Sequence, residues 1–455
     1  MTLIIDPTLD LFLYHKRDAG SDEQTEIANN QAYFTDNFPD NLKPNFDLET
    51  TADSTEYLVL LKQSQAPDIE DGGYKITASY YAVLLADTYG LFYTSSLTND
   101  TTPQDISCLP IMKKQIIQKT GDIGRTWMIS ACLQNGDCAE TVAKNIYQTS
   151  FSGDGWKNKQ QGKFLEGDIF EIYQNPPDGK SREESHVLII LFPTPTDKAN
   201  LGKLTKVLMQ LLCFRHKVFW AYQKTRESKQ ELQKVYQSIR NTINDFGKHF
   251  IGNELTSEQL GKLEKILKTN LANFYDYGNQ LNYLETYKQT IEVNLHNYKQ
   301  ALQNIGSKAA GLGESNLIFL DIFTDLVEQK YYKQIEKDYA SLSPGLNMLE
   351  NLINTIRGIV EIEQAQSNRR IEIRDRQFQS FVAVAGVGVA TASLTATAVA
   401  PVIQQITTPL PNETTSKANH SGFIWTGFFL LCLILGVVSG GIAYWARSRQ
   451  HSSSN

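Results

Sequence analysis

Histidine and cysteine are the residues with which this chain could build a catalytic or metal site, and their spacing favours neither. The seven histidines lie far apart, with no HxxxH or HExxH pair, and the five cysteines include no CxxC pair of the kind that holds zinc. A cysteine–histidine hydrolase could be assembled from Cys132 or Cys138 with His186, because such partners need to meet only in space. No local motif supports that arrangement. The sequence therefore predicts a non-enzymatic protein with no catalytic residue, no metal ligand and no cofactor.

Other motifs of small-ligand chemistry are incomplete. The segment TGDIGRT lacks the GxxxxGK(S/T) spacing of a phosphate-binding loop, and no GxGxxG follows an expected strand. The acidic segment PDIEDGG, with Asp68, Glu70 and Asp71, lacks the ligand order and the terminal Glu of an EF-hand loop. We interpret it as a solvated turn rather than a cation site.

The segment CFRHKVFWAYQK, residues 213–224, is the densest mixture of aromatic and basic side chains. Nucleic-acid bases could stack on such rings, but a packed helix that extends its cations to solvent explains the pattern better. The chain has a formal net charge of -7, and its basic residues do not form the clustered face that nucleic acid requires. Nucleic acid is therefore not an expected partner.

Residues 1–195 are expected to form an α+β or α/β domain. Short β-rich runs such as LDLFLY, YLVLLK and HVLIILFP stand between turn signals, and YYAVLLADTYGLFYTSS indicates a hairpin at ADTYG. The segments PIMKKQIIQKTG and CAETVAKNIYQTSF are typical of helices. No secretory signal opens the chain, because MTLIIDPTLDLF lacks a basic start, so the domain is expected in the cytoplasm. Its expected ligand is an unknown protein or small molecule.

Residues 196–377 are expected to be all-helical, as a bundle or coiled-coil stalk. The amphipathic segments are residues 198–246, 256–278, 283–305, 315–339 and 346–377. Apolar side chains at helical spacing predict the packed faces of two of them. These side chains are Leu284, Tyr287, Ile291, Leu295, Tyr298 and Leu302 in one helix, and Leu346, Leu349, Ile353, Ile356 and Val360 in the other.

Two uncharged runs follow, at residues 378–403 and 423–446, and each is long enough to cross a bilayer as a helix. The second is rich in Leu, Ile and Phe and has aromatic residues at both ends, as membrane-spanning helices do. Arginines flank the pair of runs: Arg369, Arg370, Arg374 and Arg376 precede it, and Arg447 and Arg449 follow it. Their expected role is to set the topology or to contact anionic lipid. The loop 404–422 carries only Lys417 as a positive charge, so the positive-inside rule places this loop outside and the tail 447–455 in the cytoplasm. The sequence thus predicts a two-helix transmembrane hairpin with both termini cytoplasmic.

The first predicted span, FQSFVAVAGVGVATASLTATAVAPVI, is unusually rich in small residues. Gly386 and Ala390 have the small-xxx-small spacing that lets helices approach closely, and Ser393 and Thr397 lie one turn apart. This stripe is either a helix-packing face or the wall of a pore.

The order of these parts resembles the architecture of CorA-type magnesium transporters, with a cytoplasmic domain, long helices, a stalk entering the first span, a short outer loop and a second span. That resemblance implies a homo-oligomer in the lipid bilayer. The family carries a Gly-Met-Asn signature where its first span ends, whereas this chain reads APVIQQITTP, so magnesium selectivity transfers to no residue. The runs GDIFEIYQNPPDGK, HVLIILFP, LLCFRHKVFWAYQ and TIRGIVEIEQAQSNRR are also similar to a group of uncharacterised cyanobacterial membrane proteins. That likeness implies a bacterial inner (plasma) membrane or a thylakoid membrane.

From these features we expect a cytoplasmic sensor or binding domain, coupled through a helical stalk to an oligomeric two-span module that acts as a CorA-like channel or membrane effector. The alternative is a membrane-tethered interaction or scaffold module whose hairpin is only an anchor.

Overall fold

A computed structural model describes residues 2–17, 57–60, 68–98, 102–116, 121–151, 154–173, 186–249 and 255–367, together with residues 25, 28, 32 and 33. Two compact units are present in the chain. The first comprises residues 1–232 and 280–341, and the second comprises residues 233–279 and 342–455. Each is described by itself.

The first unit contains a mixed sheet of ten strands among the described residues, with the order β2-β4-β5-β1-β7-β10-β9-β8. Its strands are β1 (Leu3–Lys16), β2 (Leu58–Val59), β3 (Ile69–Asp71), β4 (Tyr74–Leu85), β5 (Thr88–Leu97), β6 (Gln104–Asp105), β7 (Gly124–Cys132), β8 (Gln160–Phe164), β9 (Gly167–Tyr173) and β10 (His186–Phe192). The pairing of β7 with β10 is parallel, and the other pairings are antiparallel. The expected hairpin is confirmed as β4 and β5, and HVLIILFP is confirmed as the central strand β10.

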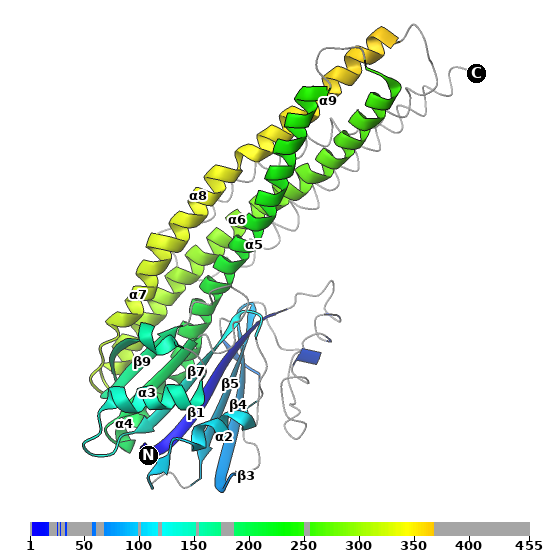
Figure 1. The fold of residues 1–455 in the computed structure, drawn as a ribbon. Helices are drawn as coiled ribbons and strands as arrows, with labels where there is room; N and C mark the ends of the chain where they lie inside the picture. The colour runs from blue at the N-terminus through cyan, green and yellow to red at the C-terminus, as the bar shows by residue number, and fades with distance from the viewer. Residues whose placement is uncertain are drawn as a thin grey trace. The chain divides into compact units, whose positions relative to one another are not determined.

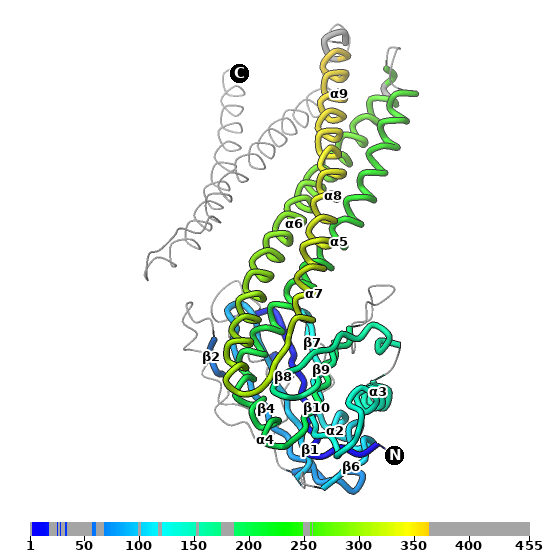
Figure 2. Tube along the Cα trace, turned by 90° about the vertical axis from the view of Figure 1, so that its left-hand side faces the viewer, coloured from blue at the N-terminus to red at the C-terminus, as the bar shows by residue number. Residues whose placement is uncertain are grey.

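One face of the sheet packs against α2 (Cys108–Gln115) and α3 (Ala139–Ser150), as Figures 1 and 2 show. Alternate residues of the strands point to this face, because side chains of a strand alternate between the two sides. Leu9, Leu11 and Leu13 of β1 therefore share a core with Val142 and Ile146 of α3. Both helices were expected from the sequence, and the α+β class of this region is confirmed.

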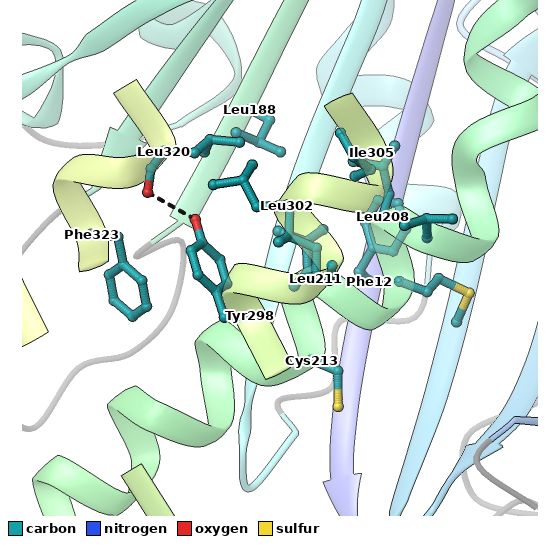
Figure 3. Packing of buried hydrophobic residues seen from close by; sticks show 14 of the residues in the cluster. Phe12, Leu188, Leu208, Leu211, Cys213, Tyr298, Leu302, Ile305, Leu320 and Phe323 are labelled. Atoms are coloured by element: carbon teal, nitrogen blue, oxygen red, sulfur yellow. Dashed lines mark hydrogen bonds between the residues drawn. The ribbon is translucent and has the colours of Figure 1, made fainter. Parts of the chain in front are cut away.

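The opposite face packs against helices from later in the chain, so Phe12 and Tyr14 of β1 share a second core with residues of α5, α6 and α7. The helices are α4 (Pro195–Ala199), α5 (Thr205–His249), α6 (Ser257–Ala309), α7 (Ile318–Leu326) and α8 (Lys333–Leu342). Figure 3 shows Phe12 and Leu188 of the sheet among leucine and isoleucine side chains of these helices. Most of the apolar stripe expected on residues 284–302 is buried, as predicted, with Tyr287 half-buried.

Some of the described elements differ from the expectation. Strand β7 was not expected, because GRTWMISAC starts with polar residues and lacks a clear alternation. Residues 256–278 and 283–305, expected as separate helices, belong to one helix, α6. The expected helix 315–339 contains a π-helical turn, Val327–Tyr332, between α7 and α8.

The second unit contains α9 (Pro344–Ser367), the described part of the expected stalk helix. The hydroxyl of Tyr277 donates a hydrogen bond of 2.6 Å to the carbonyl of Leu342, just before α9 begins. A Cβ atom on Gly345 would lie 2.3 Å from the Tyr277 hydroxyl oxygen, so a side chain there would displace the tyrosine. The predicted packed face is confirmed by burial of Leu349, Ile353, Ile356 and Val360, while Leu346 is half-buried.

Candidate functional site

A buried polar network joins the sheet to α5 within the first unit. Thr126 of β7, Glu171 of β9 and His186 of β10 lie on the sheet face that α5 covers, because their registers place them on the same side as Met128 and Leu188. The network residues are Thr126, Glu171, His186, Arg215 and His216, and each is at most 6% exposed. Groups of this kind are retained in a core only with hydrogen-bonding partners.

The hydrogen bonds of this network form a continuous chain. His186 Nε2 lies 3.0 Å from Glu171 Oε1, and His186 Nδ1 lies 2.6 Å from the hydroxyl oxygen of Thr126. The same hydroxyl oxygen lies 2.7 Å from His216 Nε2. An ionised carboxylate only accepts, so His186 Nε2–H donates to Glu171. When His186 is neutral, its Nδ1 accepts from the Thr126 hydroxyl. The Thr126 oxygen then accepts from His216 Nε2–H, and the protonation pattern of the chain is fixed.

Gly124 makes room for His216. A Cβ atom on this glycine would lie 2.5 Å from His216 Nδ1. Any side chain at position 124 would therefore push the imidazole away from Thr126.

The network ends in a buried ion pair, in which Arg215 Nη2 lies 2.9 Å from Glu171 Oε1. Burial opposes the charge of Glu171, but the Arg215 guanidinium and the His186 hydrogen bond outweigh it and hold the pKa of Glu171 below its usual range. Burial, reinforced by the charge of Arg215, lowers the pKa of His186 despite its bond to Glu171. The imidazole of His186 is therefore neutral at physiological pH, which sets the donor and acceptor roles given above.

Aromatic rings from the helices and from the sheet surround Arg215. The guanidinium carbon lies 4.3 Å from the ring centre of Phe323 in α7 and 5.7 Å from that of Tyr173 in β9. Such cation–π contacts stabilise a desolvated guanidinium. Tyr331, in the π-helical turn, stacks on Tyr222 of α5 with ring centres 3.8 Å apart. Turns of π-helix occur frequently at functional sites, and this one packs against the same helix that carries Arg215.

A cavity of about 20 Å³ lies beside the ion pair. Glu171, His186, Arg215 and Tyr298 line it together with apolar side chains. Tyr298, drawn in Figure 3, donates its hydroxyl to the carbonyl of Leu320 at 3.1 Å. A space of this size holds about one water molecule and no substrate.

This arrangement connects two layers of the unit, and it does not have the geometry of a nucleophilic site. Both nitrogens of His186 are engaged by Thr126 and Glu171, and neither bonds to Cys132 or Cys138. Burial raises the pKa of the Cys132 thiol to about 11, so this sulfur is protonated and a poor nucleophile. Within the described residues, no three His, Cys, Asp or Glu side chains gather as a metal site.

The acidic segment and the aromatic–basic segment identified in the sequence occupy different parts of the first unit. Asp68, Glu70 and Asp71 belong to the β3–β4 hairpin, where Asp68 pairs with Lys75 at 3.0 Å. The segment 213–224 is part of α5, as expected, but two of its cations, Arg215 and Lys217, are buried rather than extended to solvent. Arg215 bonds to Glu171 and Lys217 bonds to Asp87, so these two charges connect the helix to the sheet.

The candidate membrane residues fall outside the described part of the chain. These are Gly386, Ala390, Ser393 and Thr397 of the small-residue stripe, and Arg369, Arg370, Arg374, Arg376, Arg447 and Arg449. The segments 378–403, 404–422, 423–446 and 447–455 also lie outside it. Among the described helices, none combines the length and the apolar character that a membrane crossing requires.

The buried network itself was missed by sequence reasoning. Glu171 is the single acidic residue within the apolar run IFEIY, and Arg215 and His216 stand within an apolar helix face. An isolated charge in an apolar run is the available signal, because it requires a buried partner. The identity of that partner depends on the tertiary fold. No family of known proteins, no curated protein and no solved structure matches this chain.

Proposed function

We propose that this protein is a non-enzymatic membrane protein. A cytoplasmic α+β domain binds a ligand, and long helices couple that domain to an oligomeric two-span module. The module, formed by residues 378–446, acts as a CorA-like channel or as a membrane effector in a bacterial plasma or thylakoid membrane. Two uncharged runs flanked by arginines support the membrane part of this proposal.

The observation that carries the coupling is the buried network between the sheet and α5. A change in the strands that moves Glu171 or His186 must either move Arg215 or leave its charge unpaired, because both partners are buried. Breaking a buried pair is costly, so the two layers are expected to move together. A ligand on the sheet domain can therefore bias the helices by its differential affinity for two arrangements.

The oligomeric state of the full chain in detergent tests the membrane module. Two spans cannot enclose a channel alone, so a ring of several subunits is expected. A strict monomer would contradict the pore and leave the alternative, in which the hairpin anchors an interaction module.

Ion flux into liposomes tests conduction directly. We expect Gly386→Leu to reduce flux, because a large side chain on the small-residue stripe would obstruct helix approach or a pore. Val384→Leu is the matched control, since a position two residues away lies on the opposite side of a helix. Equal flux in both variants and the wild type would contradict a pore at this stripe.

A further inference from the structure

Two rows of polar side chains lie on the face of the sheet that also packs against α5. One row crosses four neighbouring strands and the other crosses three. Directly paired residues share a face, so the registers of β4, β5, β1 and β7 define the rows. The first row is Thr77, Ser96, Thr8 and Ser130, and the second is Ser79, Thr94 and Asp10. We call these seven residues the hydroxyl face. Phe12 and Tyr14 continue the same side of β1 into the core beneath α5.

The hydroxyl face is only partly covered. Along β4 and β5, the residues that point to the α2 side are buried, whereas those of the hydroxyl face between them are half-buried. Tyr81 and Phe92, the next pair toward α5, are also half-buried. The face thus offers hydroxyls bordered by two accessible aromatic rings.

Charges at both ends of the hydroxyl face are paired. At one end, Lys198 Nζ lies 2.6 Å from Asp6 Oδ1 and 2.7 Å from Thr8 Oγ1. At the other end, the Thr77 hydroxyl donates to Asp68 Oδ1 at 2.8 Å. No unpaired cation is therefore offered to an anionic ligand by these groups.

Between these ends lie polar atoms without partners. Asp10 Oδ1 and Ser130 Oγ have no hydrogen-bond partner among the described residues, although the side chains are only 4% and 1% exposed. Buried polar atoms in native proteins are normally satisfied by protein, water or ligand. Their diagonal placement on adjacent strands puts both unsatisfied groups beneath the same part of the hydroxyl face.

We propose that the hydroxyl face binds a neutral polyhydroxylated molecule, a sugar or a polyol. Serine and threonine hydroxyls both donate and accept, so they match the hydroxyls of such a ligand. The Asp10 carboxyl adds a polar group at the base of the face. The half-buried rings of Tyr81 and Phe92 border the face with apolar surface for the C–H groups of a sugar. Polar groups placed beside aromatic surface are the usual composition of small-molecule sites.

This inference rests on the proposed function in one respect, because it names what the cytoplasmic domain binds. Binding can nevertheless be measured whether or not the protein forms a channel. Failure of sugar binding would leave the oligomer and flux tests unaffected, and the reverse also holds.

The experiment is saturation-transfer NMR and calorimetry on the full chain, purified in a detergent without a sugar headgroup. Glucose, sucrose and myo-inositol are the probes, and at least one is expected to bind saturably with one ligand per chain. Each probe is tested up to about 50 mM, because a weaker affinity would not define a binding site. Absence of saturable binding by all three probes would overturn the proposal.

Variants then locate the site. Replacing two hydroxyls, Ser79→Ala with Ser96→Ala, is expected to weaken binding at least about fivefold, since each lost hydrogen bond contributes a modest amount. Ser95→Ala is the matched control, because this serine lies between Thr94 and Ser96 but points to the α2 side. Equal affinity in the double variant and the wild type would overturn the site, and so would an equal loss in the control.

Discussion

At the residue scale, the ion pair of Arg215 and Glu171 joins α5 to the sheet at a high cost in desolvation free energy. Taking both charges out of water costs several kcal/mol per ion, and their attraction offsets this only with good geometry. The pair has that geometry, since a 2.9 Å contact is reinforced by His186 and by the ring of Phe323. An apolar contact would hold α5 on the sheet without this desolvation cost. We therefore interpret the ion pair as a device that specifies one position of α5 on the sheet.

Glu171→Gln is expected to lower the free energy of unfolding by about 3–5 kcal/mol, because it leaves the Arg215 charge buried and unpaired. Adding Arg215→Met should recover at least about half of that loss, because the unpaired charge is then removed. Urea unfolding followed by circular dichroism measures both effects.

The control for this prediction is Glu227→Gln, which breaks an exposed pair with Lys224 on the same helix. That change should cost less than about 0.5 kcal/mol. If Glu171→Gln lowers the free energy of unfolding by no more than Glu227→Gln does, the buried pair has no structural role.

The buried carboxyl of Asp10 predicts how the stability of the first unit depends on pH. Burial raises its pKa from 3.8 to about 7, despite a hydrogen bond from Thr94 and the charge of Lys198. The folded chain therefore holds a proton that the unfolded chain releases between these two values, so stability falls as the pH rises through this window. The shift corresponds to about 4 kcal/mol above pH 7.

Asp10→Asn removes this titration while keeping the shape of the side chain. We expect the variant to be more stable than the wild type at pH 8, by about 2–4 kcal/mol, and the two to converge toward pH 4. Urea midpoints across this pH range measure the difference. If Asp10→Asn is more stable than the wild type by the same amount at every pH, ionisation of Asp10 is not the cause of the difference.

At the element scale, the connection between α6 and α7 closes the β8 edge of the sheet. The amide and carbonyl of Lys163 both bond to Asn316, at 3.1 and 2.8 Å, and Glu166 N–H donates to the carbonyl of Glu314 at 2.9 Å. An edge strand would otherwise present unpaired groups to other chains. The same connection therefore protects the sheet and places α7, with Phe323, above Arg215.

Gly162 makes this closure possible, because a Cβ atom there would lie 2.5 Å from the carbonyl oxygen of Asn316 and from the ring of Phe319. Gly162→Ala is expected to destabilise the first unit by about 1–3 kcal/mol. Gly202→Ala, where a Cβ atom meets nothing within 4 Å, should leave stability nearly unchanged. Thermal unfolding of the pair measures this, and equal midpoints would show that the edge tolerates the added methyl group.

Elements were predictable from the sequence to the extent that their patterns are local. The β4–β5 hairpin, β10, α2 and α3 follow from alternation or helical spacing, and all are found. The continuity of α6 was missed because weak helix formers around Gly278 suggest a break that packing overrides. The buried network could not be predicted, because Thr126, Glu171 and Arg215 come from distant segments whose pairing only the fold establishes.

At the scale of the whole molecule, the chain divides into two units of different composition. The first unit holds the sheet, the network and the hydroxyl face, whereas the described part of the second unit consists of helical segments with an apolar interior. Under the proposed function, the sheet of the first unit would bind the ligand and the helices would transmit the change.

The predicted topology is testable with cysteine labelling in spheroplasts, using a maleimide that does not cross membranes. Arginines on both sides of the hairpin and a loop with one lysine should hold both termini inside. Ser416→Cys, in the loop 404–422, should therefore be labelled in intact spheroplasts. Ser452→Cys, in the tail, should be labelled only after the membrane is permeabilised.

The native Cys138, which is exposed on the first unit, serves as the internal reference for the cytoplasmic side. Its labelling should also require permeabilisation, because the hairpin keeps the sheet domain and the tail on the same side. If Ser416→Cys and Ser452→Cys become accessible together, the chain between them does not cross the membrane. Residues 423–446 would then lie on the bilayer or in the protein core, and a channel built from this hairpin would be ruled out.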